Sequence, residues 1–305
     1  MKAAVIGVGH LGQHHARILA TLPGISLAGV VDINRERAQK IASDHGTTAF
    51  GDVRDISGLE LAVVAAPTES HSAIALPLIA SGVHTLIEKP VASTLAEADA
   101  LIAAAKSSGA VLAVGHSERF NPAVAAARPY VNDPRFIEVH RLGTQLGRSL
   151  DIDVVLDLMI HDLDLILSMV PSAVESVEAV GVPVLTPKVD IANARVRFEN
   201  GCIANLTASR ISREQIRKIR FFQRERYVSI DTAAREVEMY QLAPQAAGLP
   251  KIDGGKLTVP GDEPLKRELE DFVAAVREKR APQVPGEQGR AALALAVRIV
   301  ELMRQ

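Results

Sequence analysis

The sequence predicts an α/β protein with two domains, the first built on a parallel sheet and the second on a mostly antiparallel sheet. Short apolar runs alternate with helical patterns over about the first 120 residues, and strand-like runs with few helices between them dominate the remainder. A glycine-rich turn directly follows the first apolar run. We expect the first domain to span residues 1–120 and the second to span residues 121–305.

The first domain contains five expected strands separated by helical segments. Strands that alternate with helices of this length indicate βαβ units and therefore a parallel sheet. The expected strands span residues 3–7, 26–32, 61–65, 83–87 and 111–114. The expected helices are one that ends at residue 22 and three that span residues 35–42, 70–80 and 95–106.

The second domain contains one long apolar helix, at residues 154–169, and a series of strands. Asn200-Gly201 between two of the strands is a strong hairpin signal, so we expect an antiparallel sheet with one helix against it. The strands are expected at residues 136–142, 174–182, 191–198, 202–209, 216–222, 226–231 and 236–240. A loop-rich segment is expected at 244–261, followed by helices at 264–279 and 286–303.

The composition is that of a globular protein, with 48% hydrophobic and 23% charged residues. A net charge of -2 gives no field that would recruit nucleic acid or an anionic membrane, so we expect neither as a partner. Cys202 is the single cysteine, which excludes an internal disulfide and a thiolate metal cluster. No residue spacing suggests any other metal site. No apolar stretch has membrane-spanning length, and we expect a cytoplasmic protein.

The glycine-rich turn reads Gly7-Val8-Gly9-His10-Leu11-Gly12, a G-x-G-x-x-G that follows an expected strand and opens an expected helix. In a dinucleotide site, Gly7 makes the tight turn, Gly9 admits the pyrophosphate and Gly12 lets helix and strand pack closely. The helix N-terminus then presents N–H groups and a positive dipole end to the pyrophosphate. The alternative is a glycine-rich turn in some other α/β protein. The context favours a Rossmann domain that binds a dinucleotide.

Asp32 lies twenty residues beyond Gly12, at the end of the second expected strand. Its carboxylate can accept hydrogen bonds from the adenosine ribose and would repel a 2′-phosphate, so we expect NAD rather than NADP as the cofactor. Arg35 and Arg37 lie nearby and weaken this preference.

Other strand ends carry further candidates, because ligands of such sheets bind beyond the carboxyl ends of the strands. Pro67 and Thr68 end one strand and His71 begins the next helix, while Glu88-Lys89-Pro90 ends another strand. Lys89 is a candidate catalytic residue, and its alternative is a solvated surface lysine. His116 follows the last strand, beside the Ser117–Pro122 segment, and could also face a ligand.

The long apolar helix carries one polar stripe. At about 100° per residue, Asp153, Asp157, His161 and Asp164 share a face. Asp157 and His161 stand at i,i+4 and can hydrogen-bond, which is the arrangement that a general base needs near neutral pH. The alternative is a structural His–Asp pair. Asp162 points the other way and is expected at the surface or in an interface.

Basic side chains are plentiful in the second domain, whereas aromatic residues make up 3% of the chain and Trp is absent. Arginine binds phosphate oxygens through bidentate, charge-assisted hydrogen bonds, which favours a diphosphate substrate over a neutral polyol. The alternative is a solvated strand face or a subunit contact. The basic residues are Arg119, Arg141, Arg148, Arg210, Arg213, Arg217, Lys218, Arg220, Arg224 and Arg226.

These motifs together resemble the glucose–fructose oxidoreductase / inositol dehydrogenase (Gfo/Idh/MocA) family over nearly the whole chain. The resemblance rests on GVGHLG at the start, Asp32, PTESH at 67–71, EKP at 88–90, ERFNP at 118–122, DLMIHDLD at 157–164 and ELEDFVAAVREKRAPQV at 268–284. It implies a Rossmann domain followed by an α/β domain with an open, mostly antiparallel sheet that commonly forms oligomer contacts. The last helix is expected to pack back toward the first domain.

The resemblance also implies roles for single residues. Lys89 would orient the substrate hydroxyl, His161 would be the general base and Asp157 its partner, so these three are the expected catalytic residues. The expected cofactor-binding residues are Gly7, Gly9, His10, Leu11, Gly12, Asp32, Pro67, Thr68, His71, Glu88 and Lys89, with Thr68, His71 and Glu88 at the nicotinamide half. The expected substrate-binding residues are His116, Arg119, Asn121, Arg141, Asp157, His161 and Arg210. One departure is visible, because many members carry a glycine triplet where this chain has residues 151–154, and this puts the shape of the substrate pocket in question.

Within the family, the segments ERFNPAV, HRLG, DIDVVLDLMIHDLDLIL and VDIANARVRFENGCIANLTASRISRE most resemble a branch of UDP-N-acetylglucosamine 3-dehydrogenases. That branch implies oxidation of the 3-hydroxyl of UDP-N-acetylglucosamine or a related UDP-sugar, for envelope lipid (lipid A) synthesis, by a homodimer or homotetramer. The alternatives are an inositol or free-sugar dehydrogenase of the same family and a non-catalytic regulator that senses NAD. The intact Lys89, Asp157 and His161 favour an enzyme.

Overall fold

The computed structural model describes residues 1–144, 150, 152–243 and 251–304. These residues form two compact units. Unit 1 comprises Met1–Ser117 and Pro264–Arg290, and unit 2 comprises Glu118–Glu263 and Ala291–Gln305. The domain limits expected at 1–120 and 121–305 remain a prediction, because compactness alone does not establish which segments fold independently.

Unit 1 contains a six-stranded parallel sheet in the order β3-β2-β1-β4-β5-β6. This is the strand order of the Rossmann fold, and it confirms the expected fold class for this part of the chain. The strands are β1 (Lys2–Ile6), β2 (Ser26–Val31), β3 (Ala49–Phe50), β4 (Leu61–Val64), β5 (His84–Glu88) and β6 (Leu112–Gly115). Residues on both faces of β1, β4 and β5 are buried, as the apolar runs predict.

Two helices of unit 1 begin at residues whose side chains cap them, α2 and α4. In α4, Thr94 and Glu97 form a capping box, and Gly109 ends the helix in the left-handed conformation with φ 71°. In α2, the Asn34 side chain accepts the Arg37 backbone N–H. The helices are α1 (Gly12–Leu19), α2 (Arg35–Asp44), α3 (Thr68–Ala80), α4 (Leu95–Ser108) and α7 (Pro264–Glu278), with a 3₁₀ turn at η1 (Val53–Asp55).

The segment from Pro264 returns to unit 1. In α7, the buried Leu269, Phe272 and Val273 pack in the same apolar cluster as Ile18 and Leu19 of α1. The helix α8 (Gly286–Leu302) begins in unit 1, and its residues from Ala291 onward belong to unit 2.

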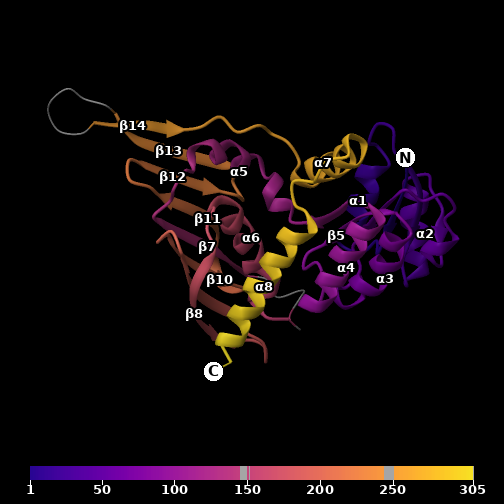
Figure 1. Ribbon diagram of the computed structural model, residues 1–305, viewed down its shortest axis with the longest axis horizontal. Helices are drawn as coiled ribbons and strands as arrows, with labels where there is room; N and C mark the ends of the chain where they lie inside the picture. Colours follow the sequence, from indigo (N-terminus) through magenta and orange to yellow (C-terminus); the bar gives the residue numbers. More distant parts are fainter. Residues whose placement is uncertain (145–149, 151, 244–250, 305) are drawn as a thin grey trace. The chain divides into compact units, whose positions relative to one another are not determined.

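Unit 2 contains an eight-stranded sheet in the order β14-β13-β12-β11-β7-β10-β9-β8, much of which is labelled in Figure 1. All neighbouring pairs are antiparallel except β7 and β10, which confirms the expected mostly antiparallel sheet. The strands are β7 (Phe136–Thr144), β8 (Val174–Val182), β9 (Ile191–Phe198), β10 (Ile203–Ser209), β11 (Ile211–Phe222), β12 (Arg226–Asp231), β13 (Glu236–Ala243) and β14 (Lys251–Lys256).

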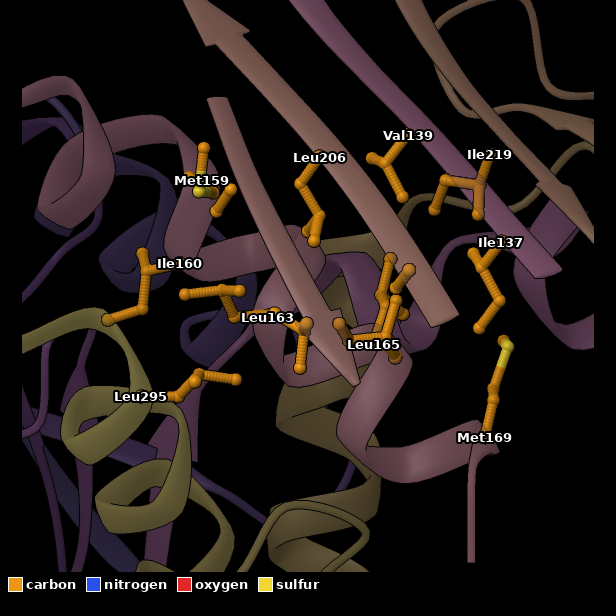
Figure 2. Close-up of a cluster of buried hydrophobic side chains, with 14 of the residues drawn as sticks. Ile137, Val139, Met159, Ile160, Leu163, Leu165, Met169, Leu206, Ile219 and Leu295 are labelled. Atoms are coloured by element: carbon orange, nitrogen blue, oxygen red, sulfur yellow. The ribbon is translucent and has the colours of Figure 1, made fainter. Parts of the chain in front are cut away.

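One face of this sheet carries the core of unit 2. Alternate residues of β7, β9 and β10 point into it, and a nearly continuous helical segment packs on them: the π-helical turn η4 (Val155–Met159) followed by α6 (Ile160–Met169). Figure 2 shows Ile137, Val139, Leu206 and Ile219 of the sheet with Leu163, Leu165 and Met169 of α6, together with Leu295 of α8. Each fully buried large aliphatic side chain stabilises the fold by about 1.5–3 kcal/mol relative to exposure.

Unit 2 also contains elements that the sequence did not predict. Residues 251–256 were expected in a loop-rich segment and instead form β14, while residues 244–250 of that segment lie outside the described part of the chain. A short helix, α5 (Pro122–Ala127), follows the 3₁₀ turn η2 (Ser117–Phe120) and precedes η3 (Arg128–Tyr130). Within the described ranges, no helix combines the length and the apolar character needed to cross a membrane.

Candidate functional site

The glycine-rich turn after β1 is built as a dinucleotide site requires. Gly7 has φ +85°, and a Cβ there would lie 2.6 Å from the Ala66 backbone nitrogen. A Cβ on Gly12 would lie 1.7 Å from the Gly7 carbonyl oxygen, so only glycine lets α1 approach the turn this closely. A Cβ on Gly9 would meet nothing within 4 Å, which leaves this backbone open to a ligand.

The N-terminus of α1 is available for an anion. The N-cap residue, Leu11, forms no side-chain hydrogen bond to this end, and the first turn of the helix contains no acidic residue. His10 and Leu11 are exposed in the turn beside it, as expected for residues that flank a bound ligand. The positive dipole end of the helix therefore meets no carboxylate of its own first turn.

Asp32 follows β2, and each of its carboxylate oxygens accepts two hydrogen bonds. Oδ2 accepts from the backbone N–H of Val8 at 2.9 Å and from Nε of Arg37 at 3.0 Å. Oδ1 accepts from the backbone N–H of Asn34 at 2.8 Å and from Nη2 of Arg37 at 2.7 Å. Burial raises the pKa of Asp32, but these hydrogen bonds outweigh burial and the pKa lies below its ordinary value. Asp32 is therefore ionised at neutral pH and tied to the glycine-rich turn through Val8.

Ile33 is a residue that the sequence analysis missed. It follows Asp32 directly and is 98% exposed, although it is a large apolar side chain. An isolated exposed isoleucine is common on protein surfaces. Its place beside Asp32, the carboxylate expected to bind the ribose, makes it a candidate contact for the adenine base.

The His71 ring lies between the segments that follow β4 and β5 and is within hydrogen-bond distance of a carbonyl oxygen in each. Its Nδ1 lies 2.9 Å from the Pro90 carbonyl oxygen and its Nε2 lies 2.8 Å from the Ala66 carbonyl oxygen. Burial lowers the pKa of His71 and prevails over the hydrogen bonds that raise it, so the neutral ring, with one N–H, can donate to only one of these oxygens. His71 is 1% exposed, while Pro67 is exposed and Thr68 half-buried at the start of α3.

Glu88 ends β5 and Lys89 follows it directly, with a cis peptide bond between Lys89 and Pro90. Glu88 Oε1 lies 2.7 Å from Nε2 of the buried His15, and Glu88 Oε2 accepts the Lys89 backbone N–H at 3.2 Å. Burial raises the pKa of Glu88. His15 and the Lys89 charge lower it by a larger amount, so the pKa of Glu88 lies below its ordinary value. The ionised Glu88 thus fixes the backbone of Lys89 from inside unit 1.

The contact between His15 and Glu88 was not predicted from the sequence. No spacing along the chain brings residue 15 to residue 88, because the contact depends on how α1 packs on the parallel sheet. Gly115, at the end of β6, belongs to the same packing, since a Cβ there would lie 2.9 Å from Glu88 Oε2. Next to it, His116 is 1% exposed.

His15, Glu88 and Glu268 of α7 form a buried group of possible metal ligands, with ligand atoms within 4.8 Å of one another. His15 and Glu88 already hydrogen-bond to each other at 2.7 Å. Because this contact pairs the two side chains directly, we assign the cluster a structural role.

In unit 2, Asp157 lies in the π-helical turn η4 and His161 in the first turn of α6. Both are half-buried. π-Helical turns inserted in helices occur frequently at functional sites. The hydrogen bond expected between Asp157 and His161 stays a prediction. Asp153, another member of the predicted stripe, has a backbone partner, because its carboxylate accepts the Val189 N–H at 3.0 Å.

The ERFNP segment forms a buried charged network in unit 2. Arg141 of β7 donates Nε and Nη2 to the two Asp162 oxygens, both at 2.8 Å, and Nη1 to Glu118 Oε1 at 3.1 Å. Asn121 donates Nδ2 to Glu118 Oε2 at 3.1 Å and caps α5 through its Oδ1. Arg141 and Asn121, both expected to bind substrate, are thus held together by Glu118.

Two further pairs bury charge in unit 2. Arg119 donates Nη1 to Asp164 Oδ1 at 3.3 Å. Arg210 is 1% exposed, donates Nη2 to the Ile152 carbonyl oxygen at 2.6 Å and lies 3.7 Å from Asp190. Arg119 and Arg210, both expected substrate ligands, are thus bound to groups inside unit 2.

Asp162 was expected at the surface or in an interface, and this prediction was wrong. The residue is 2% exposed, and its carboxylate binds Arg141. Burial raises the pKa of Asp162 more than Arg141 lowers it. The sequence could not reveal this because the partner comes from a strand 21 residues earlier.

Comparison with known proteins identifies the class. Residues 1–116 match the model of an oxidoreductase family with an NAD-binding Rossmann fold, and residues 138–225 match the GFO/IDH/MocA C-terminal domain. The chain therefore belongs to the GFO/IDH/MocA oxidoreductase family. This confirms the family expected from the motifs and NAD as the cofactor.

Particular relatives match between about two thirds and all of the chain. The UDP-N-acetylglucosamine 3-dehydrogenase of Acidithiobacillus ferrooxidans is 40% identical over 302 residues, or 98% of this chain and 96% of that protein. The solved structure of that organism's UDP-N-acetylglucosamine 3-dehydrogenase GnnA matches with a TM-score of 0.93, covering 100% of this chain and 99% of the other. The scyllo-inositol 2-dehydrogenase of Bacillus subtilis is 27% identical, covering 70% of this chain and 68% of that protein. A levoglucosan dehydrogenase structure, at 20% identity and a TM-score of 0.89, shares the fold.

The residues of unit 1 fit NAD. The open backbone at Gly9, the free helix N-terminus of α1 and the ionised Asp32 are the three features that pyrophosphate and ribose recognition need.

Proposed function

We propose that this protein oxidises the 3-hydroxyl of UDP-N-acetylglucosamine, or of a related UDP-sugar, to a ketone. Support for the substrate comes from the relative that shares 40% identity along 98% of this chain and carries that activity in its name. Support for the chemistry comes from a lysine held at a strand end in an NAD-binding unit, where ligands of parallel sheets bind. This placement of Lys89 is the observation that carries the proposal.

The cofactor is held by the glycine-rich turn. In this proposal, backbone N–H groups at the start of α1 bind the pyrophosphate, Asp32 accepts ribose hydroxyls, and Ile33 contacts the adenine base. Thr68 lies near the nicotinamide. His71 and Glu88 are buried, so they support the nicotinamide region without direct exposure to solvent. NAD, when bound, accepts the hydride from the substrate carbon.

The proton of the hydroxyl is removed by this chain's own side chains. Lys89 holds the hydroxyl oxygen and stabilises the negative charge that develops on it. His161 accepts the proton at a ring nitrogen, and Asp157 orients the ring. The Glu88 carboxylate fixes the Lys89 backbone, so the ammonium group is presented from a rigid strand end.

The diphosphate needs exposed cations. The guanidinium groups of Arg119, Arg141 and Arg210 bind acids or a carbonyl inside unit 2. We therefore assign these arginines a structural role beside the substrate site and not direct binding of the diphosphate. Arg217 of β11 is exposed and pairs in register with Arg141, which places it on the face of the sheet that carries α6. We therefore assign diphosphate binding to Arg217, with the exposed Arg213 near it in sequence.

The competing functions differ in what they need. An inositol or free-sugar dehydrogenase would use the same Lys89 and His161 but no diphosphate site. A regulator that senses NAD would need neither side chain. Incubation of the purified protein with NAD and a panel of sugars, inositols and UDP-sugars separates them. We expect NADH and a product two hydrogens lighter, by mass spectrometry, from a UDP-sugar. NAD binding without turnover on any panel member would support the regulator instead.

The proposal extends to the cellular setting. A cytoplasmic homodimer or homotetramer that supplies a 3-keto nucleotide sugar for envelope lipid synthesis is consistent with the free, buried thiol of Cys202 and with the exposed face of the unit 2 sheet.

A further inference from the structure

The carboxylate of Asp32 has no acceptor capacity left. An ionised carboxylate offers about four lone-pair positions, and four hydrogen bonds occupy them. Two of the donors are backbone N–H groups of Val8 and Asn34, which the turn and the α2 cap hold in place. The other two belong to one side chain, the guanidinium of Arg37.

Arg37 is the partner that can move. The Asp32 side chain is 3% exposed, whereas the Arg37 side chain is 44% exposed on the first turn of α2. A ribose that hydrogen-bonds to Asp32 must therefore replace at least one Arg37 N–H group. The guanidinium and the ribose hydroxyls compete for the same oxygens.

We propose that Arg37 is a specificity-determining residue of the cofactor site, which competes with the ribose for Asp32 and offers its guanidinium to a 2′-phosphate. This inference rests on the proposed binding of the adenosine ribose at Asp32. A bare carboxylate repels a 2′-phosphate, but a carboxylate paired with a bidentate guanidinium is neutralised, and a displaced guanidinium binds phosphate oxygens well. The protein thus prefers NAD, but less strongly than Asp32 alone would dictate.

The test compares Arg37→Ala with Arg35→Ala, a matched control on the same turn whose side chain is also exposed. Dissociation constants for NAD and NADP are measured by calorimetry without any sugar. For Arg37→Ala we expect the ratio of the NADP constant to the NAD constant to rise about tenfold, because the unmasked carboxylate repels the phosphate. NAD itself should bind as tightly as before or more tightly. Arg35→Ala should change the ratio less than about twofold.

A conservative variant refines the test. Arg37→Lys keeps the charge but loses the two parallel N–H groups, so its ratio is expected between those of the wild type and Arg37→Ala. An unchanged ratio in Arg37→Ala, with wild-type NAD affinity, would overturn the inference and leave the proposed reaction intact. Failure of the wild-type protein to bind either nucleotide would instead contradict the proposed function.

Discussion

At the residue scale, we propose that His161 of α6 and Lys89, which follows β5, carry out the chemistry. A positioned general base contributes about 10²–10⁴-fold to turnover. His161→Ala should therefore lower kcat by about that factor, and Lys89→Ala should lower kcat as well. NAD affinity, measured by calorimetry, should stay within about threefold in His161→Ala, because its side chain belongs to unit 2 and not to the nucleotide-binding unit. Near-wild-type turnover in both variants would show that these residues are not catalytic.

The lowered pKa of Glu88 leads to a prediction about how the free energy of unfolding depends on pH. Its pKa in the folded protein lies below the ordinary value of 4.5, so its ionised form stabilises the fold at higher pH, and this contribution is lost as the pH falls through the folded-state pKa. Glu88→Gln should lower the free energy of unfolding by about 1–3 kcal/mol at neutral pH. The difference from wild type should shrink as the pH falls below about 4.5. Denaturant unfolding across a pH series measures it.

The exposed Glu36 supplies the control for this prediction. Glu36→Gln should change the free energy of unfolding by less than about 0.5 kcal/mol. A Glu88→Gln variant with wild-type stability at neutral pH would mean that the His15–Glu88 contact contributes nothing to the fold.

At the scale of elements, sequence patterns located most strands and helices because periodicity reports burial. β8, β9 and β12 have the expected bounds, and in β9 buried and exposed residues alternate along the strand. β14 was missed because it carries Gly254 and Gly255 and exposed side chains, which mimic a loop. The strand exists because its backbone pairs with β13, and a sequence pattern does not report such pairing.

The apolar helix shows a second limit. The predicted stripe assumed about 100° per residue, but Val155–Met159 form a π-helical turn, which widens the local spacing. The glycine turn, Asp32, Lys89 and the DxxxH motif could be found from local spacing alone. The contacts of Arg37, His15 and Arg141 could not, because tertiary packing decides which acid each one meets.

Strand β11 offers a test of the diphosphate site. Arg217 lies on the face that carries α6, whereas Arg220 pairs in register with Glu138 and binds its carboxylate at 2.7 Å on the opposite face. Arg217→Ala should raise KM for the UDP-sugar about tenfold, because a charge-assisted hydrogen bond to phosphate is lost. Arg220→Ala should leave KM nearly unchanged. Equal effects of the two variants in steady-state kinetics would contradict the assignment.

At the scale of the whole molecule, the face of the unit 2 sheet opposite α6 carries an apolar strip beside the Arg220–Glu138 ion pair. A row of ring contacts, with centroids 5.2–6.4 Å apart, crosses four strands through Phe136, Phe222, Tyr227 and Tyr240. Beyond the row, Leu242 and Ile252 are 44% and 67% exposed. Exposed apolar side chains gathered in this way can mark an interaction site, and a second copy of the chain is the occupant that we propose.

Assembly through this face predicts a dimer or tetramer by light scattering at micromolar concentration. Ile252→Asp should shift the mass toward the monomer, because it places a charge in the contact. Leu76→Asp, which changes an exposed leucine of α3, should leave the mass unchanged. A monomeric wild-type protein would contradict the proposed assembly.

The central claim is that a UDP-sugar is the substrate. The most direct test compares kcat/KM for NADH formation with UDP-N-acetylglucosamine, N-acetylglucosamine and myo-inositol. We predict that UDP-N-acetylglucosamine exceeds the other two by about 100-fold or more, since binding of the diphosphate contributes several charge-assisted hydrogen bonds. Comparable kcat/KM with the free sugar or with inositol would contradict the account, because it would mean that the diphosphate is not recognised.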